Sequence, residues 1–369
     1  LDKIRDQAFN KFNFNVNKKK NFKIIHISNF GNRQANRLYN ISIAKKISNG
    51  LIRNGHDVIN ISDRDVVRLN RGLRSFNKGL NYFNNLLLET IDNYKPDALI
   101  LGHVNNINDK TFEIIKKNNK NIKISQWFED NLSVKGPDPD ANFSNFTKYA
   151  DYLDHSFVTS DPKFLKLDKK IKCSFMPIPV DENIEFLDCF KNKNPIKDVF
   201  FTMSHGVNKG VLRKNKVDVR EPFVSKLISN NKNLVFDIYG YKNKQPIWAR
   251  DFYDALYKSK MALNLSRINN VKYYSSNRIA SLIGNGILTF VDKNTKLDHF
   301  FSNDEVVFYK NLDDLSEKIN YYKENHIRRN FIAKKGKEKY FRIFNNKIIA
   351  DFICSRLFGT NIKNLSWMK

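Results

Sequence analysis

The chain has 369 residues, too many for one ordinary hydrophobic core, so at about 150 residues per domain it is expected to form two domains. Hydrophobic residues make up 41% and aromatic residues 13%, which excludes a disordered protein, and no apolar run approaches the ~20 residues that cross a bilayer. The 64 Lys and Arg against 38 Asp and Glu give a net charge of +26, which suits an anionic partner such as nucleic acid, phospholipid or a phosphorylated substrate. The alternative is compositional drift, because Lys, Asn, Ile and Phe are enriched together, as in AT-rich genes, and drift with a membrane or nucleotide-phosphate role is favoured over a dedicated nucleic-acid surface.

The first half alternates short apolar runs with helical periodicity, the pattern of an α/β domain with a parallel sheet. We predict strands at residues 22–28, 56–62, 97–102, 122–127 and 155–159. Helices are predicted near residues 38–51, 76–94 and 110–117, the first from an apolar stripe at Leu38, Ile41, Ala44, Ile47 and Leu51.

A second half of the same kind follows a hinge. Residues 176–182 carry two prolines in seven residues, and the charged stretch after them ends near Lys197. Strands are predicted at residues 198–203, 234–239, 261–265, 286–291 and 306–309, and three helices at 312–358. The predicted fold is therefore α/β, with two Rossmann-like domains that face each other across a cleft. We assign residues 1–178 to an acceptor domain, 179–345 to a donor domain, and 346–369 to a final helix that could pack back on the first domain.

Ligands of open parallel sheets bind where the strands end, so the candidate site residues are expected there. After the strand at 122–127, Glu129 and Asp130 are adjacent carboxylates where a general acid or base would sit, and the neighbouring aromatic residues could raise a carboxyl pKa. Alternatively, Asp130 or Asn131 only caps the next segment. On the acceptor side, Asn29 and Gly31 lie in a polar turn that lacks the glycine patterns of dinucleotide and Walker sites, and an ordinary turn explains them equally well.

Three segments of the second half could hold an anionic donor. The loop at 204–220 has cations that suit a diphosphate, although a solvated turn explains some of them, and its His205 could be a base or a structural hydrogen-bonding residue. The run at 273–278 places capping residues and an arginine at a predicted helix start, and Gly240 could let a nucleobase approach the backbone. The donor-side candidates are Lys209, Arg213, Gly240, Tyr241, Tyr274, Ser275, Ser276, Asn277 and Arg278.

The run at 261–292, MALNLSR followed by YYSSNRIASLIGNGILTFVD, resembles the C-terminal domain of group-1-type glycosyltransferases, especially the CgeB-like branch. The stretch HFFSNDEVVFYKNLDDLSEKINYYKENHIRRNFIAKKGKEKY is similar to the tail of the same family, and the similarity covers about the last 170 residues. The resemblance implies the GT-B architecture and sugar transfer from a nucleotide donor without an obligatory metal. It also implies that Asn277 and Arg278 occupy the start of the donor-binding helix, and Lys209 and Arg213 the phosphate-facing loop.

One position departs from this pattern, because the glutamate that the family often places inside that helix falls on Ser281 here. A carboxylate contact to ribose or sugar is therefore in doubt, and with it a UDP or GDP donor; a CMP-activated acidic sugar such as Kdo is the alternative that the basic charge suggests.

We therefore predict a glycosyltransferase with a nucleotide sugar as co-substrate, no cofactor and no metal. Its expected acceptor is a glycan or lipid-linked molecule of cell-surface polysaccharide synthesis. An epimerase of nucleotide sugars with the same fold is an alternative, and a basic nucleic-acid-binding protein is a weaker one, because no nucleic-acid-binding motif is present. Three cysteines without a CxxC pattern and a start without an apolar signal segment favour the cytoplasm. The basic charge would allow a peripheral position at an anionic membrane.

Overall fold

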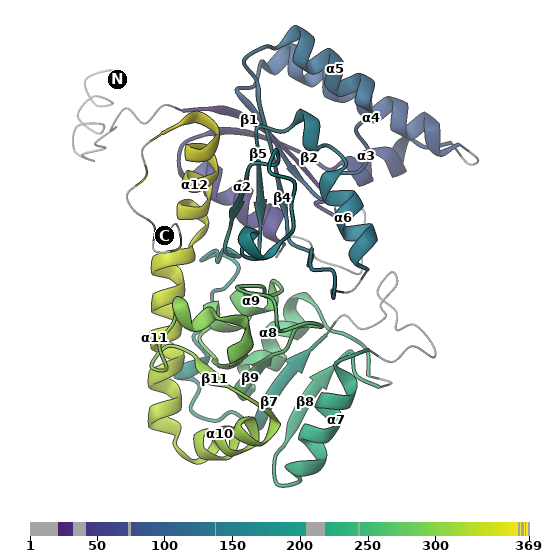
Figure 1. Ribbon diagram of the computed structural model, residues 1–369. Helices are drawn as coiled ribbons and strands as arrows, with labels where there is room; N and C mark the ends of the chain where they lie inside the picture. Colours follow the sequence, from purple (N-terminus) through teal and green to yellow (C-terminus); the bar gives the residue numbers. More distant parts are fainter. Residues whose placement is uncertain are drawn as a thin grey trace, which may run out of the picture.

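The computed structural model describes residues 21–31, 42–72, 75–136, 138–203, 218–242, 244–360, 362, 365 and 367. These residues form two lobes, each built on one parallel sheet with helices on both faces (Figure 1). Among them, no helix is long and apolar enough to cross a membrane.

The N-terminal lobe has a six-stranded sheet in the order β2-β1-β3-β4-β5-β6. Its strands are β1 (Lys23–Ser28), β2 (Asp57–Ile61), β3 (Ala98–Gly102), β4 (Lys123–Phe128), β5 (His155–Val158) and β6 (Cys173–Phe175). Its helices are α2 (Ile43–Arg53), α3 (Asp63–Asn70), α4 (Phe76–Tyr94), α5 (Asp109–Asn118) and α6 (Pro139–Thr147). The central strand β3 is buried along its whole length, as expected of a parallel strand covered on both faces.

The C-terminal lobe has a five-stranded sheet in the order β11-β10-β9-β7-β8. Its strands are β7 (Lys197–Thr202), β8 (Phe236–Tyr239), β9 (Ser259–Asn264), β10 (Leu288–Asp292) and β11 (Val307–Tyr309). Its helices are α7 (Glu221–Asn230), α8 (Ala249–Tyr257), α9 (Arg278–Gly284), α10 (Leu312–Glu324) and α11 (His326–Phe344). In both lobes the first strand lies between the second and the third, so the predicted pair of Rossmann-like α/β domains is confirmed.

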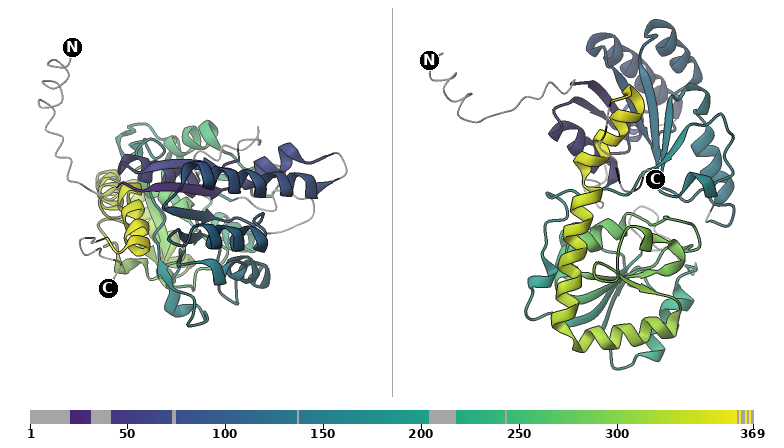
Figure 2. Two further views of the ribbon diagram at one scale, coloured as in Figure 1. Left: turned by 90° about the horizontal axis from the view of Figure 1, so that it is seen from above. Right: turned by 60° about the vertical axis from the view of Figure 1, so that its left-hand side comes forward.

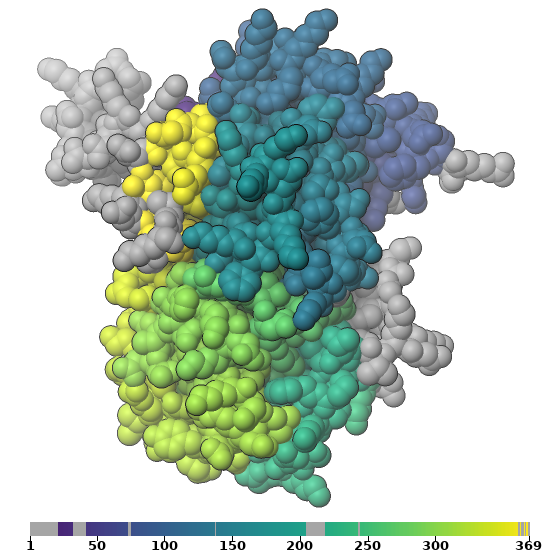
Figure 3. Space-filling view, viewed as in Figure 1, coloured from purple at the N-terminus to yellow at the C-terminus, as the bar shows by residue number. Residues whose placement is uncertain are grey.

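The last helix, α12 (Asn346–Phe358), leaves the C-terminal lobe and packs on α2 of the N-terminal lobe. Figure 3 shows its atoms, in yellow, lying against that lobe. The approach is close, because a Cβ on Gly50 would lie 2.1 Å from the carbonyl oxygen of Asn346. One apolar cluster joins Ile47 of α2, Ile353 of α12 and Ile279 of α9, so a single core extends across both lobes.

The chain crosses between the lobes twice, and the two crossings touch. The amide of Val180 donates to the carbonyl of Phe344 at 3.0 Å, and the amide of Asn346 donates to the carbonyl of Val180 at 2.9 Å. Beside them, the buried carboxylate of Asp181 accepts hydrogen bonds from Asn49 and Arg53 of α2. The predicted hinge at 176–182 is therefore bonded both to α2 and to the start of α12.

In the N-terminal lobe, one strand and two α-helices were not predicted: β6, α3 and α6. The strand β6 has only three residues, too few for a period, and α6 combines an N-terminal proline with few apolar residues. In α3 a single residue, Val67, supplies most of the buried apolar surface. The predicted start of the first helix, at residue 38, lies outside the described residues. Within the described residues, α2 begins at Ile43. The assigned domain limits stay predictions.

Candidate active site between the lobes

Residues that follow the strands at their carboxyl ends bring the two lobes together. Asp161, just after β5, forms an ion pair with Lys272, after β9, at 2.7 Å. The ammonium of Lys46 on α2 donates to Oδ1 of Asn277, at the start of α9, at 3.2 Å. Because both contacts join the carboxyl edge of the second sheet to the N-terminal lobe, the edges where ligands bind face each other.

Glu129 and Asp130 lie on the N-terminal side of this junction, directly after β4. The amide of Glu129 donates to Nε2 of His103 at 3.1 Å, and its carbonyl accepts from Oγ1 of Thr159 at 3.1 Å. Burial raises the pKa of Glu129 to about 8; the charge of Asp130 adds to the rise and that of Lys46 opposes it. The Glu129 carboxyl group can therefore exchange a proton near neutral pH.

A chain of buried hydrogen bonds fixes the end of β4. The indole Nε1 of Trp127 donates to Nε2 of His26 at 3.0 Å, so the other ring nitrogen of His26 carries the proton and donates to Ser48. Ser48 in turn donates to Oδ1 of Asn60. Burial lowers the pKa of His26 to about 3, which keeps the ring in this neutral form. The indole occupies the space over Gly102, where a Cβ would lie 2.1 Å from Trp127 Cζ2.

On the opposite side, Arg278 begins α9 and lies at the carboxyl ends of β7 and β9. Its Nε donates to the carbonyl of Thr202 at 2.8 Å and its Nη1 to the carbonyl of Leu265 at 2.9 Å. Among the described residues, no carboxylate lies within ion-pair distance of this guanidinium. Burial, together with the like charge of Arg220, lowers the pKa of Arg278 to about 9. A guanidinium held in this way is stabilised by an added anion.

The charged side chains near Arg278 carry a net positive charge. Arg220 forms a bidentate pair with Asp218, at 2.7 Å and 3.0 Å, and Arg267 reaches the same carboxylate at 3.2 Å. Burial alone would raise the pKa of Asp218, but the hydrogen bonds and charge of Arg220 hold it well below its usual range. One carboxylate therefore faces three guanidinium groups, counting Arg278.

The three polar residues before α9 differ in their hydrogen bonding. Ser275 is bonded to the side chain of Asn264 at the end of β9, at 3.1 Å, so its hydroxyl is used to hold the loop. Asn277 is the residue that receives Lys46. The hydroxyl of Ser276 is buried and lacks a hydrogen-bond partner within the described part of the chain. Ser276 is therefore the serine of this loop that remains able to bind a ligand.

Tyr274 links the two sides electrostatically. Its pKa lies well above the ordinary value because of burial, to which the charges of Asp130 and Glu129 add, while Arg278 and Arg220 oppose them. The carboxylates of one lobe and the arginines of the other therefore act on the same phenol.

Gly240 and Tyr241 contribute to packing within the C-terminal lobe. Gly240 has a φ of 72°, and a Cβ there would lie 1.9 Å from the carbonyl oxygen of Met203, so the space beside it is filled by protein. The hydroxyl of Tyr241 lies 2.7 Å from that of Ser225 on α7. Both contacts explain these residues without a ligand, and a donor contact at Gly240 or Tyr241 stays a prediction.

The remaining predicted residues are placed only in part. Asn29 accepts a hydrogen bond from the amide of Gly31, whose φ is 65°, in the turn after β1. His205, Lys209 and Arg213 lie outside the described residues.

Sequence reasoning missed Lys46 and Glu185. Both side chains are fully buried, and their charged atoms lie 2.6 Å apart. Lys46 stands next to Ile47 in a helix whose apolar stripe does not indicate a buried cation. Glu185 lies in a charged stretch of sequence, which is the pattern expected of solvent-exposed residues. Nothing in the local sequence signals that the two residues form a pair.

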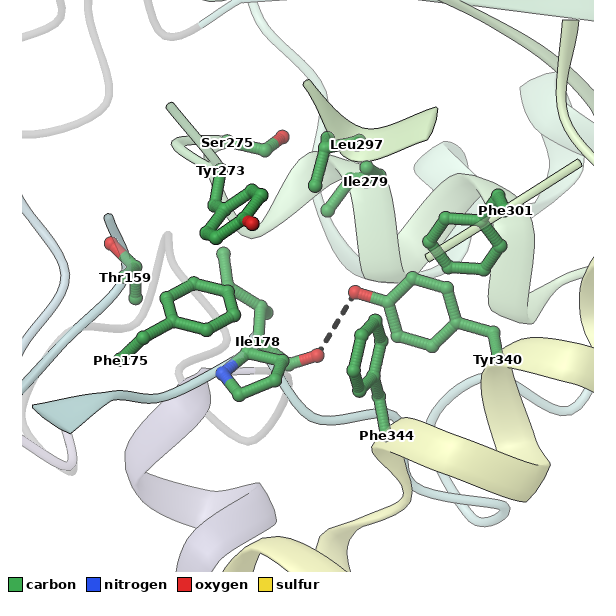
Figure 4. Close-up of a pocket in the computed structure, with 11 residues that line it drawn as sticks. Thr159, Phe175, Ile178, Tyr273, Ser275, Ile279, Leu297, Phe301, Tyr340 and Phe344 are labelled. Atoms are coloured by element: carbon green, nitrogen blue, oxygen red, sulfur yellow. Dashed lines mark hydrogen bonds between the residues drawn. The ribbon is translucent and has the colours of Figure 1, made fainter. Parts of the chain in front are cut away.

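A small apolar cavity lies beside this junction (Figure 4). Thr159 and Phe175 of the N-terminal lobe and Tyr273 of the C-terminal lobe line it, and Tyr340 donates a hydrogen bond to the carbonyl of Ile178 at its edge. Its volume of about 20 Å³ admits roughly one water molecule. The cavity is too small for a nucleotide.

One protein family is similar to part of the C-terminal half of the chain. Residues 214–355 match the family model described as "Glycosyl transferase-like". No curated protein sequence matches the chain.

Solved structures share the two-lobe fold at low sequence identity. Sucrose-phosphate synthase from Thermosynechococcus elongatus is 11% identical, with a TM-score of 0.57 over 90% of this chain and 97% of that one. HepE from Anabaena, in complex with UDP-glucose, is 12% identical, with a TM-score of 0.53 over 92% and 100%. TarM is 12% identical, with a TM-score of 0.53 over 77% of this chain, which spans 60% of the TarM chain.

The family match and the shared architecture agree with the resemblance seen in the sequence, whereas the CgeB-like branch stays a prediction. The chain therefore has the GT-B fold, and residues 214–355 are similar to the glycosyl transferase-like family.

Proposed function

We propose that this enzyme binds the phosphates of a nucleotide sugar at Arg278, beside Arg220, and transfers the sugar to a glycan or lipid-linked acceptor held near Glu129. The observation that carries the proposal is the half-buried guanidinium of Arg278, which has a like-charged neighbour and only carbonyl oxygens as hydrogen-bond acceptors among the described residues. A phosphate group would supply the missing negative charge and accept from both arginines.

The chemistry follows from where the charges lie. As the acceptor oxygen forms its bond to the anomeric carbon, the bond from that carbon to the phosphate oxygen breaks and its electron pair leaves with the phosphate. The guanidinium groups of Arg278 and Arg220 stabilise that departing charge. The proton of the acceptor hydroxyl passes to the carboxylate of Glu129, whose pKa of about 8 suits a base that works near neutral pH.

Uridine nucleotides come first among the candidates for the donor, because HepE of the same fold was crystallised with UDP-glucose. Ser281 is buried within α9 and offers no carboxylate there. GDP, CMP and dTDP therefore stay in the test. The proposed acceptor is a glycan of the cell surface. The proposed place of the reaction is the inner face of the membrane.

A thermal-shift screen against UDP, GDP, CMP and dTDP tests the phosphate site. One nucleotide should raise the Tm of the wild-type enzyme, since a ligand that binds only the folded state stabilises it. The shift should be lost in Arg278→Gln. It should be kept in the control Arg328→Gln, which removes an exposed guanidinium paired with Asp304 on the far side of the C-terminal lobe.

An equal shift in wild type and Arg278→Gln would overturn the assignment of the phosphates. Incubation with the sugar nucleotide alone separates transfer from epimerisation. Steady conversion of intact donor to an epimer, without acceptor, would overturn the transfer reaction and support the epimerase.

A further inference from the structure

The helical pair α3–α4 carries a stretch of sequence without negative charge. Between Asp65 and Glu89 there is no acidic residue, while Arg and Lys occur at four positions. In a chain with 38 Asp and Glu, an interval of this length carries formal charges of one sign only.

The structure gathers this charge at a protruding end. Figure 2 shows the two helices running outward from the N-terminal lobe. They pack tightly, since a Cβ on Gly79 of α4 would lie 2.1 Å from the carbonyl oxygen of Val67 on α3. The end of the pair is therefore a firm projection held by helix packing.

The end of the pair is apolar as well as basic. Leu69 is 67% exposed and Phe76 is 52% exposed, and both stand near the end of their helices. Arg68, Arg71 and Lys78 are exposed beside them. We call these five residues the basic tip. Large apolar side chains on a protruding, positively charged end are costly in water unless a partner covers them.

A second exposed apolar site lacks this charge. At the corner between α10 and α11, Ile327 is 77% exposed and Phe331 is 42% exposed. There, however, Arg328 is paired with Asp304, and Glu324 lies in the same groove. The charges at that corner largely cancel, so it is a natural control for the basic tip.

The base of the pair is joined to the active site. Arg64, in the first turn of α3, donates to the carbonyl of His103 at 3.2 Å, and His103 accepts the amide hydrogen of Glu129. The ring of His103 stacks on Phe128 at 4.4 Å. The projection and the proposed base are thus parts of one bonded unit.

We propose that the basic tip docks on an anionic lipid bilayer, with Leu69 and Phe76 entering the headgroup layer and Arg68, Arg71 and Lys78 lying against lipid phosphates. Exposed leucine and phenylalanine gain free energy from contact with acyl chains, which a nucleic acid does not offer. The cations match the negative surface of an anionic leaflet. This surface is separate from the phosphate site at Arg278, so either proposal can fail without the other.

Vesicle co-sedimentation of the full chain tests the docking. Vesicles of phosphatidylcholine mixed with phosphatidylglycerol should bind the wild-type protein, and vesicles of phosphatidylcholine alone should bind it much less. Arg71→Glu/Lys78→Glu should reduce binding to the mixed vesicles at least about tenfold. Leu69→Ser/Phe76→Ser should also reduce it. All these side chains are exposed, and an unchanged Tm confirms that the variants fold.

Two controls isolate the position of the charge. Arg328→Glu/Lys335→Glu makes the same change in net charge on α11, and Ile327→Ser/Phe331→Ser removes the other exposed apolar pair. Both should leave vesicle binding within about twofold of wild type, since they lie away from the tip. Equal losses in the control and tip variants, absence of binding to mixed vesicles, or displacement of the protein by short duplex DNA at low salt would each overturn the proposal.

Discussion

The ammonium of Lys46 on α2 lies 2.6 Å from the carboxylate of Glu185, and both side chains are fully buried. Glu185 belongs to the C-terminal side of the junction, where its side chain contacts Gly284 of α9. The same ammonium reaches Asn277. One lysine therefore ties the N-terminal lobe to the start and to the end of α9.

Replacing Lys46 by Met should destabilise the enzyme by about 3–5 kcal/mol, because it leaves the carboxylate of Glu185 buried without its partner. Urea unfolding measures this loss. The double variant Lys46→Met/Glu185→Gln should recover much of it, since no buried charge is left unpaired. A single variant as stable as wild type would show that the pair contributes nothing.

The raised pKa of Glu129 predicts how stability depends on pH. Between about pH 4.5 and pH 8 the folded protein keeps a proton that the unfolded chain releases, so this group's contribution to stability is lost as the pH rises through that window. Glu129→Gln removes the titration. Its Tm should exceed that of wild type by roughly a few degrees above pH 8, and the difference should vanish near pH 4. A pH-independent difference would contradict the shifted pKa.

The pH dependence of the sugar-transfer rate should reveal the titration of Glu129. The rate of the wild-type enzyme should rise with pH through an apparent pKa near 8, and Glu129→Gln should lose most of the rate, by about 10²-fold or more. Initial rates across pH with saturating donor provide the measurement. Retention of the rising limb in Glu129→Gln would assign the base to another residue.

The close contact between Gly102 and Trp127 can be tested with one methyl group. Gly102→Ala would place Cβ 2.1 Å from the indole, so the end of β4 must move, at a cost of roughly 1–3 kcal/mol. Thermal unfolding should show a lower Tm. Gly72→Ala is the matched control, because nothing lies within 4 Å of its Cβ, and its Tm should stay near that of wild type.

Two adjacent serines should separate stability from binding. Ser275→Ala breaks the contact to Asn264 and should cost about 1 kcal/mol of stability. Ser276→Ala removes a buried hydroxyl without a partner among the described residues, so its stability should not fall. If that hydroxyl contacts the donor, calorimetric titration should show weaker nucleotide binding in Ser276→Ala. Unchanged affinity would exclude the contact.

Much of the fold could be predicted because its strands are buried on both faces. Mainly apolar runs such as residues 97–102 and 286–291 can be recognised in the sequence without knowledge of their neighbours, and the structure places β3 and β10 there. The short strand β6 has no such run. This strand forms because it pairs with β5 at the edge of the sheet, and that pairing depends on the assembled sheet.

The site could be predicted only where chemistry stands next to a predicted element. Glu129 was singled out because it follows a predicted strand, and Arg278 because it stands at a predicted helix start. The role of Ser275 as a brace for Asn264, and the pairing of Lys46 with Glu185 across 139 positions, depend on how the lobes dock. No local pattern encodes a contact between such distant parts of the chain.

The two hydrogen bonds that join Val180 to Phe344 and Asn346 determine how the halves can move. Because the two crossings of the polypeptide are hydrogen-bonded to each other, they form one joint connection between the lobes. Any movement of one lobe relative to the other must bend the chain at this connection or break its backbone hydrogen bonds.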